Sequence, residues 1–357
     1  MEDSVPNSFE PGPIALFGSG ETSPSGQKIF DQLFRQLPAS PRVTILETPA
    51  GFELNSPRVA GRVGEFLEHR LQNYNPRVSI IPARRRGTPF SPDEPTILEP
   101  ILRADLIFMG PGSPSYTVRQ LQDSLAWQYL IAWHRLGAAL ALASAATIAI
   151  SAWALPVYEI YKVGEDLHWK PGLDFFGLYG LNLVFIPHWD NTEGGEELDT
   201  SRCFMGLARF EPLLEMLPEW ITVVGIDEKT GLVIDLKQGE CTVVGSGSVT
   251  VIRDGREAHF TRSQAFSIAR LGDFHMPDPE AGLPPEVYWQ AQHAQEAVKR
   301  SSQPPAEVMH LVEEREAARQ RRSWAQADAL RAQIAALGWQ VMDTGQGPVV
   351  EKAIGGS

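Results

Sequence analysis

Two side chains suited to acyl-transfer chemistry follow two apolar segments of the chain. Ser144 comes directly after the apolar run AALALA and before a second run, AATIAISAW. His188 follows the run NLVFIP, 44 residues further on. A serine hydroxyl is a weak nucleophile at neutral pH, and it becomes reactive when a histidine accepts its proton and an acidic group orients that histidine. Ser144 and His188 are therefore candidates for a nucleophile and its general base.

The position of Ser144 between a predicted strand and a predicted helix allows two interpretations. A sharp strand-to-helix turn exposes the hydroxyl and directs the first helical amides toward a developing oxyanion. Serine is equally a favoured helix N-cap, so a capping role would explain the residue without any chemistry. The residues around Ser144 leave both interpretations open.

The elements that must position these side chains follow a regular order in the first two hundred residues. Short apolar runs predict strands at PIALF, RVTIL, RVSII, ADLIFM, AALALA and NLVFIP, with amphipathic helices between most of them, including one at 115–135. Such strands are typical of a doubly wound, mostly parallel α/β sheet with helices on both faces. Ligands bind beyond the carboxyl ends of these strands. We therefore expect the segments GSGE, GPGSP, Ser144 and PHWDN to converge on one crevice.

The pattern changes after residue 220. Short alternating strands separated by DEKTG, KQGE and RDGR predict an antiparallel addition to the same domain. The final segment predicts two amphipathic helices that are broken near Ser323 and Trp324 and stop at Gly338. We predict a disordered tail at 1–12, a main domain at 13–271, a proline-rich linker with a short helix at 272–304 and a small helical module at 305–352.

Composition limits the possible functions. The formal net charge of −13 disfavours nucleic-acid binding by the chain as a whole, so that such a role would need a local basic patch. The only two cysteines, Cys203 and Cys241, have no zinc-ribbon or CxxC spacing and fit a reducing cytoplasm. The run 137–155 is marginal in length and rich in Ala and Ser, which predicts a buried strand and helix and no membrane span. The acidic first residues show no signal peptide.

The order of these segments resembles the dipeptidase E and cyanophycinase family of serine peptidases, which have a class I glutamine amidotransferase-like, flavodoxin-like fold. The resemblance covers roughly residues 13–262 and is carried by GSGE, ADLIFMGPGSPSY, LASAAT, IPHWDN and VVGIDEKTGLVI. It implies a hydrolase that cleaves an amide bond in a small peptide-like substrate and that needs no metal or organic cofactor.

The resemblance also implies roles for individual residues. Ser144 matches the nucleophile and His188 the general base, while Glu159 is the best match to the acidic member, with Glu165 in reserve. Gly112 and the amide of Ala145 fall where the family builds its oxyanion hole. The residues expected to shape the substrate site are Gly18, Ser19, Gly20, Ser113, Trp189, Asp190 and Asn191.

One departure from the family pattern motivates an alternative function. The family's turn usually reads Gly-x-Ser-Ala-Gly, whereas this chain has Leu142 and Ala146 at the two glycine positions. Small residues suit these positions because the chain backs against itself at a turn with positive φ. The alternative is a catalytically degenerate binding or adaptor protein. A glutamine amidotransferase is disfavoured because its chemistry uses cysteine where Ser144 stands.

Residues 307–351 resemble the small extension at the carboxyl end of cysteinyl-tRNA synthetases, whose nucleotide-binding core has no counterpart in this chain. The resemblance implies possible tRNA contact, and Arg315, Arg319 and Arg322 at helical spacing could meet an RNA backbone. The alternative is a solvated face balanced by the neighbouring glutamates. Trp324 and Trp339 are expected to form the packing core of this module.

Overall fold

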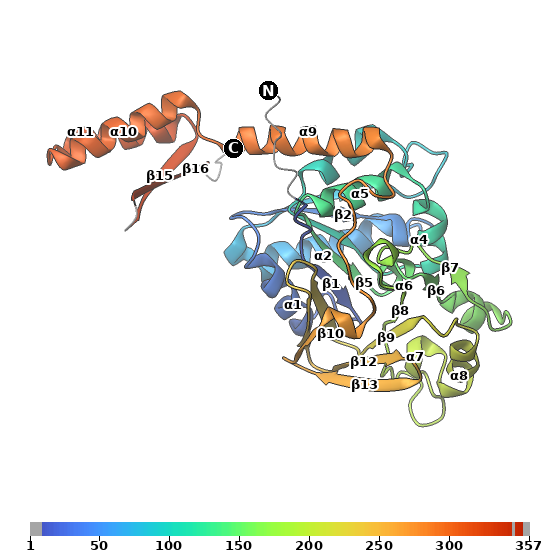
Figure 1. Cartoon of the computed structure of the whole chain (residues 1–357). Helices are drawn as coiled ribbons and strands as arrows, with labels where there is room; N and C mark the ends of the chain where they lie inside the picture. Colours follow the sequence, from blue (N-terminus) through green and yellow to red (C-terminus); the bar gives the residue numbers. More distant parts are fainter. Residues whose placement is uncertain (1–8, 345–346, 353–357) are drawn as a thin grey trace. The chain divides into compact units, whose positions relative to one another are not determined.

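The computed structural model describes residues 9–344 and 347–352 (Figure 1). The chain divides into two compact units, Met1–Ala291 and Gln292–Ser357, and each is described by itself below. The boundary falls within helix α9 (Pro285–Ser302), so the segment expected to hold a short helix in a linker contains a helix of 18 residues.

An eight-stranded sheet in the order β14-β11-β10-β1-β5-β4-β2-β3 forms the centre of the first unit. The parallel strands are β1 (Ile14–Phe17), β2 (Arg42–Leu46), β3 (Arg77–Ile81), β4 (Leu106–Met109) and β5 (Ala139–Ala143). The antiparallel strands are β10 (Thr230–Asp235), β11 (Glu240–Gly245) and β14 (Ala265–Ser267). The order β3-β2-β4-β5 corresponds to the 2-1-3-4 order of flavodoxin-like sheets. The predicted α/β fold with a mostly parallel sheet is confirmed.

A second sheet has four strands in the order β13-β12-β9-β8. Its strands are β8 (Leu183–Ile186), β9 (Thr222–Ile226), β12 (Ser248–Arg253) and β13 (Arg256–Thr261). The expected antiparallel meander is therefore split, since β10 and β11 extend the central sheet while β9, β12 and β13 build the second one. The strand that leads to His188 pairs with β9 and not with the central sheet. Ser144 and His188 thus come from different sheets.

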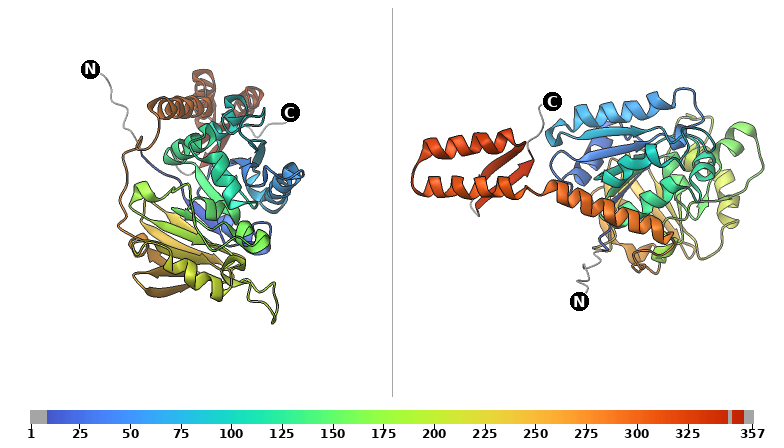
Figure 2. Two further views of the ribbon diagram at one scale, coloured as in Figure 1. Left: turned by 90° about the vertical axis from the view of Figure 1, so that its right-hand side faces the viewer. Right: turned by 90° about the horizontal axis from the view of Figure 1, so that it is seen from above.

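Helices flank the central sheet in the first unit (Figures 1 and 2). Apolar residues of α1 (Pro24–Phe34) and α2 (Ser56–Arg70) form one core cluster with side chains of β1, β2, β4 and β5. A second cluster lies between α6 (Ala145–Ala149), β8, β9 and α8 (Leu207–Glu215). Further α-helices of this unit include α3 (Pro95–Leu98), α4 (Pro114–Leu121), α5 (Leu125–Arg135) and α7 (Ser201–Phe204), and a short β6 (Trp153–Ala154) pairs with β7 (Lys170–Pro171).

One expectation about helices is wrong, and another is confirmed. The single helix predicted at 115–135 is divided into α4 and α5, because Asp123 has a left-handed backbone and Ser124 caps α5 by accepting from the Trp127 amide. The apolar run 137–155 forms β5, α6 and β6, as expected of a buried segment. Within the described residues, no helix combines the length and apolarity needed to cross a membrane.

The second unit holds a helical hairpin, α10 (Ala306–Gln320) and α11 (Trp324–Ala336), followed by a β-hairpin of β15 (Trp339–Thr344) and β16 (Gly347–Lys352) (Figure 1). Gly338 has a φ of 79° and ends α11, as predicted, but the β-hairpin after it was not expected. Trp339 is buried in the core of this unit. Trp324 is 59% exposed, so the prediction that it packs in the core is wrong.

Candidate active site

Ser144 lies at the end of β5 with a φ of 52° and a ψ of −110°, a conformation that L-residues rarely adopt. It occupies the N-cap position of α6, yet its side chain makes no capping hydrogen bond. Its Oγ lies instead 3.1 Å from Nε2 of His188. The geometry therefore favours a hydroxyl that is presented to the histidine over a hydroxyl that caps a helix.

The turn forms without the glycines at positions 142 and 146. Leu142 is fully buried, and its carbonyl oxygen accepts a hydrogen bond of 2.8 Å from the Thr147 hydroxyl. Along β5 its side chain alternates with those of Ala141 and Ala143, so it points to the opposite face of the sheet from the α1–α2 cluster that holds those alanines. Leucine at position 142 therefore packs in the core and leaves the Ser144 hydroxyl uncovered.

His188 also has a left-handed backbone, with a φ of 52°. Its amide donates to the Gly18 carbonyl oxygen at 3.1 Å, and its own carbonyl accepts from the Cys203 amide at 3.1 Å. The ring of Phe204 lies 5.9 Å from the imidazole, centroid to centroid. His188 follows β8, and these contacts with the loop after β1 and with α7 fix its position.

Glu228, in the turn between β9 and β10, completes a chain of three side chains. Its Oε1 lies 3.1 Å from Nδ1 of His188 and accepts from Nδ2 of Asn191 at 2.8 Å. The hydrogen bond to His188, followed by that from Asn191, holds the pKa of Glu228 below its usual value despite burial. The carboxylate is therefore ionised at neutral pH, and its contribution to stability is lost only as the pH falls through this lowered pKa.

Glu159 does not reach His188 in the structure. Its Oε1 accepts instead from Nζ of Lys170 at 2.9 Å. Burial alone would raise the pKa of Glu159, but the neighbouring Ser115 hydroxyl and the Lys170 ammonium lower it overall. Glu228, and not Glu159, is therefore the carboxylate that contacts the His188 ring. Glu165, the reserve, is exposed, and its carboxylate lies 3.7 Å from the His168 ring.

A cavity of about 340 Å³ opens in front of the Ser144 hydroxyl. Gly112 and Ala145 both line it, together with His188. The Ala145 amide is the first of α6 and has no carbonyl partner within its own helix, so it is free to donate to a ligand. Gly112 has a φ of 152°, and a Cβ there would lie 1.9 Å from the Pro49 carbonyl oxygen, which requires glycine at this position. Both residues therefore border the space next to the Ser144 hydroxyl, where an oxyanion hole would have to lie.

Charged side chains and a thiol also border the Ser144 cavity. Lys162 and Glu193 line it, and the Lys162 ammonium lies 4.7 Å from the centre of the Tyr161 ring. Cys203 lines it as well, but burial raises the pKa of this thiol to about 12, so it stays protonated and does not compete as a nucleophile. A larger cavity of about 870 Å³ shares Tyr158 with the first and holds Ser113 and Glu159 in its wall.

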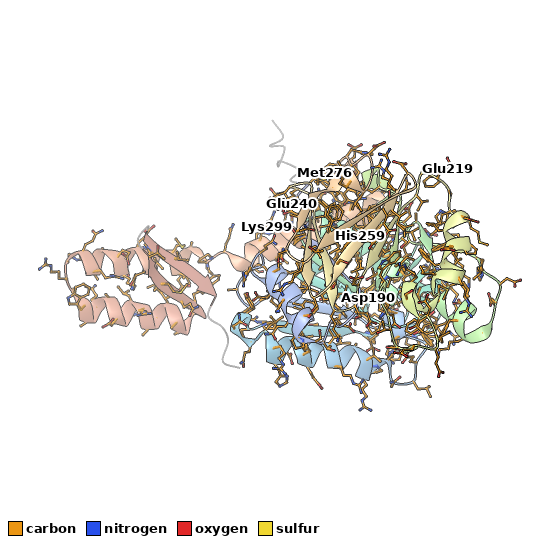
Figure 3. All side chains as sticks on the ribbon, turned by 90° about the horizontal axis from the view of Figure 1, so that it is seen from below. Asp190, Glu219, Glu240, His259, Met276 and Lys299 are labelled. Atoms are coloured by element: carbon orange, nitrogen blue, oxygen red, sulfur yellow. The ribbon has the colours of Figure 1, made fainter. Side chains whose placement is uncertain are left out.

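Most of the other residues expected at the substrate site support the three side chains instead of lining the cavity. Ser19 Oγ accepts from the Lys229 amide at 3.0 Å, and Asp190, labelled in Figure 3, accepts from the Glu228 amide at 2.7 Å. Trp189 is buried between Phe210 and the Arg202 guanidinium. The residues with such supporting positions are Gly18, Ser19, Asp190 and Asn191. Gly20 and Trp189 are not among the residues that line the cavity.

Glu228 is the residue that the sequence analysis missed. It belongs to the quoted segment VVGIDEKTGLVI, so its presence in a polar turn between two apolar strands was visible. The pairing of β8 with β9 in a second sheet, which brings this turn to His188, was not. Among the described residues, no three His, Cys, Asp or Glu side chains form a group that could hold a metal ion.

Comparison with solved structures shows the fold of the first unit. The chain is similar to a peptidase from an acI-B1 Actinobacterium, with a TM-score of 0.57 and 22% sequence identity. The likeness covers 72% of this chain and 98% of that one.

Residues 302–348 match the family model of the cysteinyl-tRNA ligase anticodon binding domain. This segment is 56% identical over 48 residues to the cysteine–tRNA ligase of Chlamydia felis, and 51% identical over 49 residues to that of Methanosarcina acetivorans. These matches cover 13% and 14% of this chain. The chain spans only about 10% of the length of these relatives, so the likeness concerns the module alone.

The backbone at Ser144 generates a prediction about stability. Positive φ costs a non-glycine residue roughly 1–3 kcal/mol, and glycine relieves this strain at an entropic cost of about 0.5–1 kcal/mol. We expect Ser144→Gly to exceed Ser144→Ala in free energy of unfolding by about 1 kcal/mol, as measured by denaturant titration. At Ser25, inside α1, the same pair of substitutions should give the opposite order. Equal stability of the two variants at position 144 would contradict a strained turn.

Proposed function

We propose that the protein is a serine hydrolase that cleaves an amide bond in a small peptide-like substrate. The observation that carries this proposal is the chain from Ser144 Oγ through the His188 imidazole to Glu228, with both distances 3.1 Å. The peptidase-like fold of the first unit is consistent with it. Such a chain activates a hydroxyl that would otherwise remain protonated.

In this mechanism Ser144 Oγ attacks the carbonyl carbon of the substrate while Nε2 of His188 accepts the hydroxyl proton. Glu228 accepts a hydrogen bond from Nδ1 and stabilises the imidazolium that forms. The amides of Gly112 and Ala145 donate to the negatively charged oxygen of the tetrahedral intermediate. His188 then returns the proton to the leaving amine, and a water molecule activated by the same imidazole hydrolyses the acyl-enzyme.

The lining of the cavity supports a short peptide as substrate. One ammonium, Lys162, and one carboxylate, Glu193, border the space in front of Ser144 and suit the two charged ends of a short peptide. The volume of about 340 Å³ lies at the low end of the range for small-molecule sites. The adjoining cavity of about 870 Å³ offers room for the part of a substrate beyond the scissile bond.

Covalent labelling tests the nucleophile. A fluorophosphonate probe should label the wild-type protein at one site, because the phosphorus atom is attacked by an activated serine. Ser144→Ala should abolish the label, while Ser151→Ala, which removes a fully buried serine hydroxyl outside the cavity, should retain it. A label that survives Ser144→Ala would remove this residue from the mechanism. Absence of labelling in the wild type would favour the catalytically degenerate alternative.

The two candidate carboxylates give a second prediction. Glu228→Gln should slow fluorophosphonate labelling by at least about 100-fold, because a neutral amide neither favours the required tautomer nor stabilises the imidazolium. Glu159→Gln is the matched control, and it should leave the labelling rate within about threefold, since its carboxylate pairs with Lys170. The reverse order of the two variants would restore Glu159 as the acidic member.

A second candidate function, tRNA contact, is favoured by the family match at 302–348. The predicted stripe of arginines is only partly available, because Arg315 and Arg319 both pair with Asp343. The exposed group is Arg321, Arg322 and Trp324, at the turn between α10 and α11. Two guanidinium groups beside an exposed indole suit a phosphate backbone and an unstacked base.

Filter binding of tRNA to the full chain at low and at physiological salt tests this contact. Retention should fall as salt rises, and the double variant Arg321→Gln, Arg322→Gln should weaken it and reduce the salt slope by about 2. The control is Arg58→Gln, Arg62→Gln, which removes the same charge from the exposed face of α2. Retention that is independent of salt, or equal losses in both variants, would contradict a contact at this turn.

A further inference from the structure

A separate cavity of about 160 Å³ lies in the first unit, between α5 and the segment that follows β7. It shares no residue with the cavity in front of Ser144. Its wall is about equally polar and apolar, and its apolar part includes Trp127, Ile131, Leu173, Phe175 and Leu178. Since drug-sized ligands occupy roughly 300–1,000 Å³, this space suits a much smaller molecule.

Arg135, the last residue of α5, places a buried guanidinium in this wall. The residue is 1% exposed, and its Nη1 donates to the carbonyl oxygens of Pro279 and Ala281 at 3.0 and 2.7 Å. Its Nε is buried and has no hydrogen-bond partner among the described residues, and the same holds for the hydroxyl of Tyr179, another wall residue. In the described part of the chain no carboxylate lies within 4.0 Å of this cation.

A buried guanidinium without a carboxylate is unusual, because desolvation of a charge is offset best by an opposite charge. The two loop carbonyls and the carboxyl end of α5 stabilise Arg135 only through their dipoles. An anionic group in the cavity would provide the missing charge. Arg135 and Tyr179 thus form a donor pair suited to a carboxylate.

Two carboxylates of the protein border the same cavity. Asp174 has a left-handed backbone with a φ of 46°, and Asp123 is exposed beside Gln122. Partial burial raises the pKa of Asp174, while the hydrogen bond to the Gly177 backbone lowers it to a smaller extent, and no cation contributes to the shift. A ligand that carried only negative charge would be repelled by these residues, whereas an ammonium group would be attracted to them.

We propose that this cavity binds a free apolar α-amino acid of about the size of leucine. Its carboxylate would contact Arg135 and Tyr179, its ammonium would contact Asp174, and its side chain would pack against Trp127 and Phe175. The cavity is coupled to the nucleophile through backbone hydrogen bonds. The amides of Leu173, Asp174 and Phe175 donate to the carbonyls of Ala149, Ser151 and Ile150, at the end of α6, whose first turn follows Ser144.

Titration calorimetry of the full-length protein with three ligands tests the proposal. L-leucine should bind, while 4-methylpentanoate, which lacks the ammonium, and L-leucinamide, which lacks the carboxylate, should each bind at least tenfold more weakly. A charged hydrogen bond of the usual strength gives a difference of this order. No binding of L-leucine at millimolar concentration would overturn the proposal, as would equal affinity for either analogue.

A pair of variants locates the binding. Asp174→Asn should lower the affinity for L-leucine at least tenfold, and asparagine tolerates the left-handed backbone at this position. The matched control is Asp254→Asn, since Asp254 has the same charge and a φ of 52° in a distant turn. Ser144→Ala should bind L-leucine like the wild type. Binding that is lost in Ser144→Ala but kept in Asp174→Asn would place the amino acid in the Ser144 cavity and refute this site.

Discussion

The carboxyl end of β1 holds the parts of the candidate site in register. The Phe17 carbonyl accepts from the Ser144 amide, and the Gly18 carbonyl accepts from the His188 amide. On its other side, the Gly18 amide donates to Thr230, beyond the turn that carries Glu228. A Cβ at Gly18 would lie 2.0 Å from the Asp227 carbonyl oxygen, so only glycine allows this approach. The glycine-rich loop after β1 therefore acts as a junction between two sheets, and not as a wall of the cavity.

This junction explains which features the sequence could reveal. Apolar runs and their spacing predicted the parallel strands, because burial on both faces leaves a clear pattern. Ser144 and His188 were recognisable because each follows such a run directly. Glu228 was not, because its role depends on the pairing of β8 with β9, a tertiary contact without a local signal. Glu159 was the best match to the acidic member of the family, but in the structure its carboxylate pairs with Lys170 on β7.

In the carboxyl-terminal module, too, the sequence could not reveal a tertiary contact, in this case an ion pair. Helical spacing placed Arg315 and Arg319 on one face, yet it could not show that a β-hairpin would bring Asp343 to both of them. The pairing holds the pKa of Asp343 far below its usual value. It also neutralises part of the positive charge that Arg315 and Arg319 would otherwise present to RNA. Composition alone cannot separate arginines that hold a fold together from arginines that meet a ligand. The exposed pair at the α10–α11 turn is distinguished only by its position in three dimensions.

The short length of α6 has a consequence for how its two ends influence each other. The helix has only five residues, and the left-handed Ser144 precedes it directly, while the segment 173–175 is bonded to the three residues that end it or follow it. Packed interiors transmit small displacements because they contain little free volume. A ligand that ordered the segment 173–175 would therefore act on the backbone that fixes the φ of Ser144. The distance from Oγ to Nε2 depends on that angle. Helix α6 therefore links the occupancy of the cavity beside α5 to the reactivity of the serine.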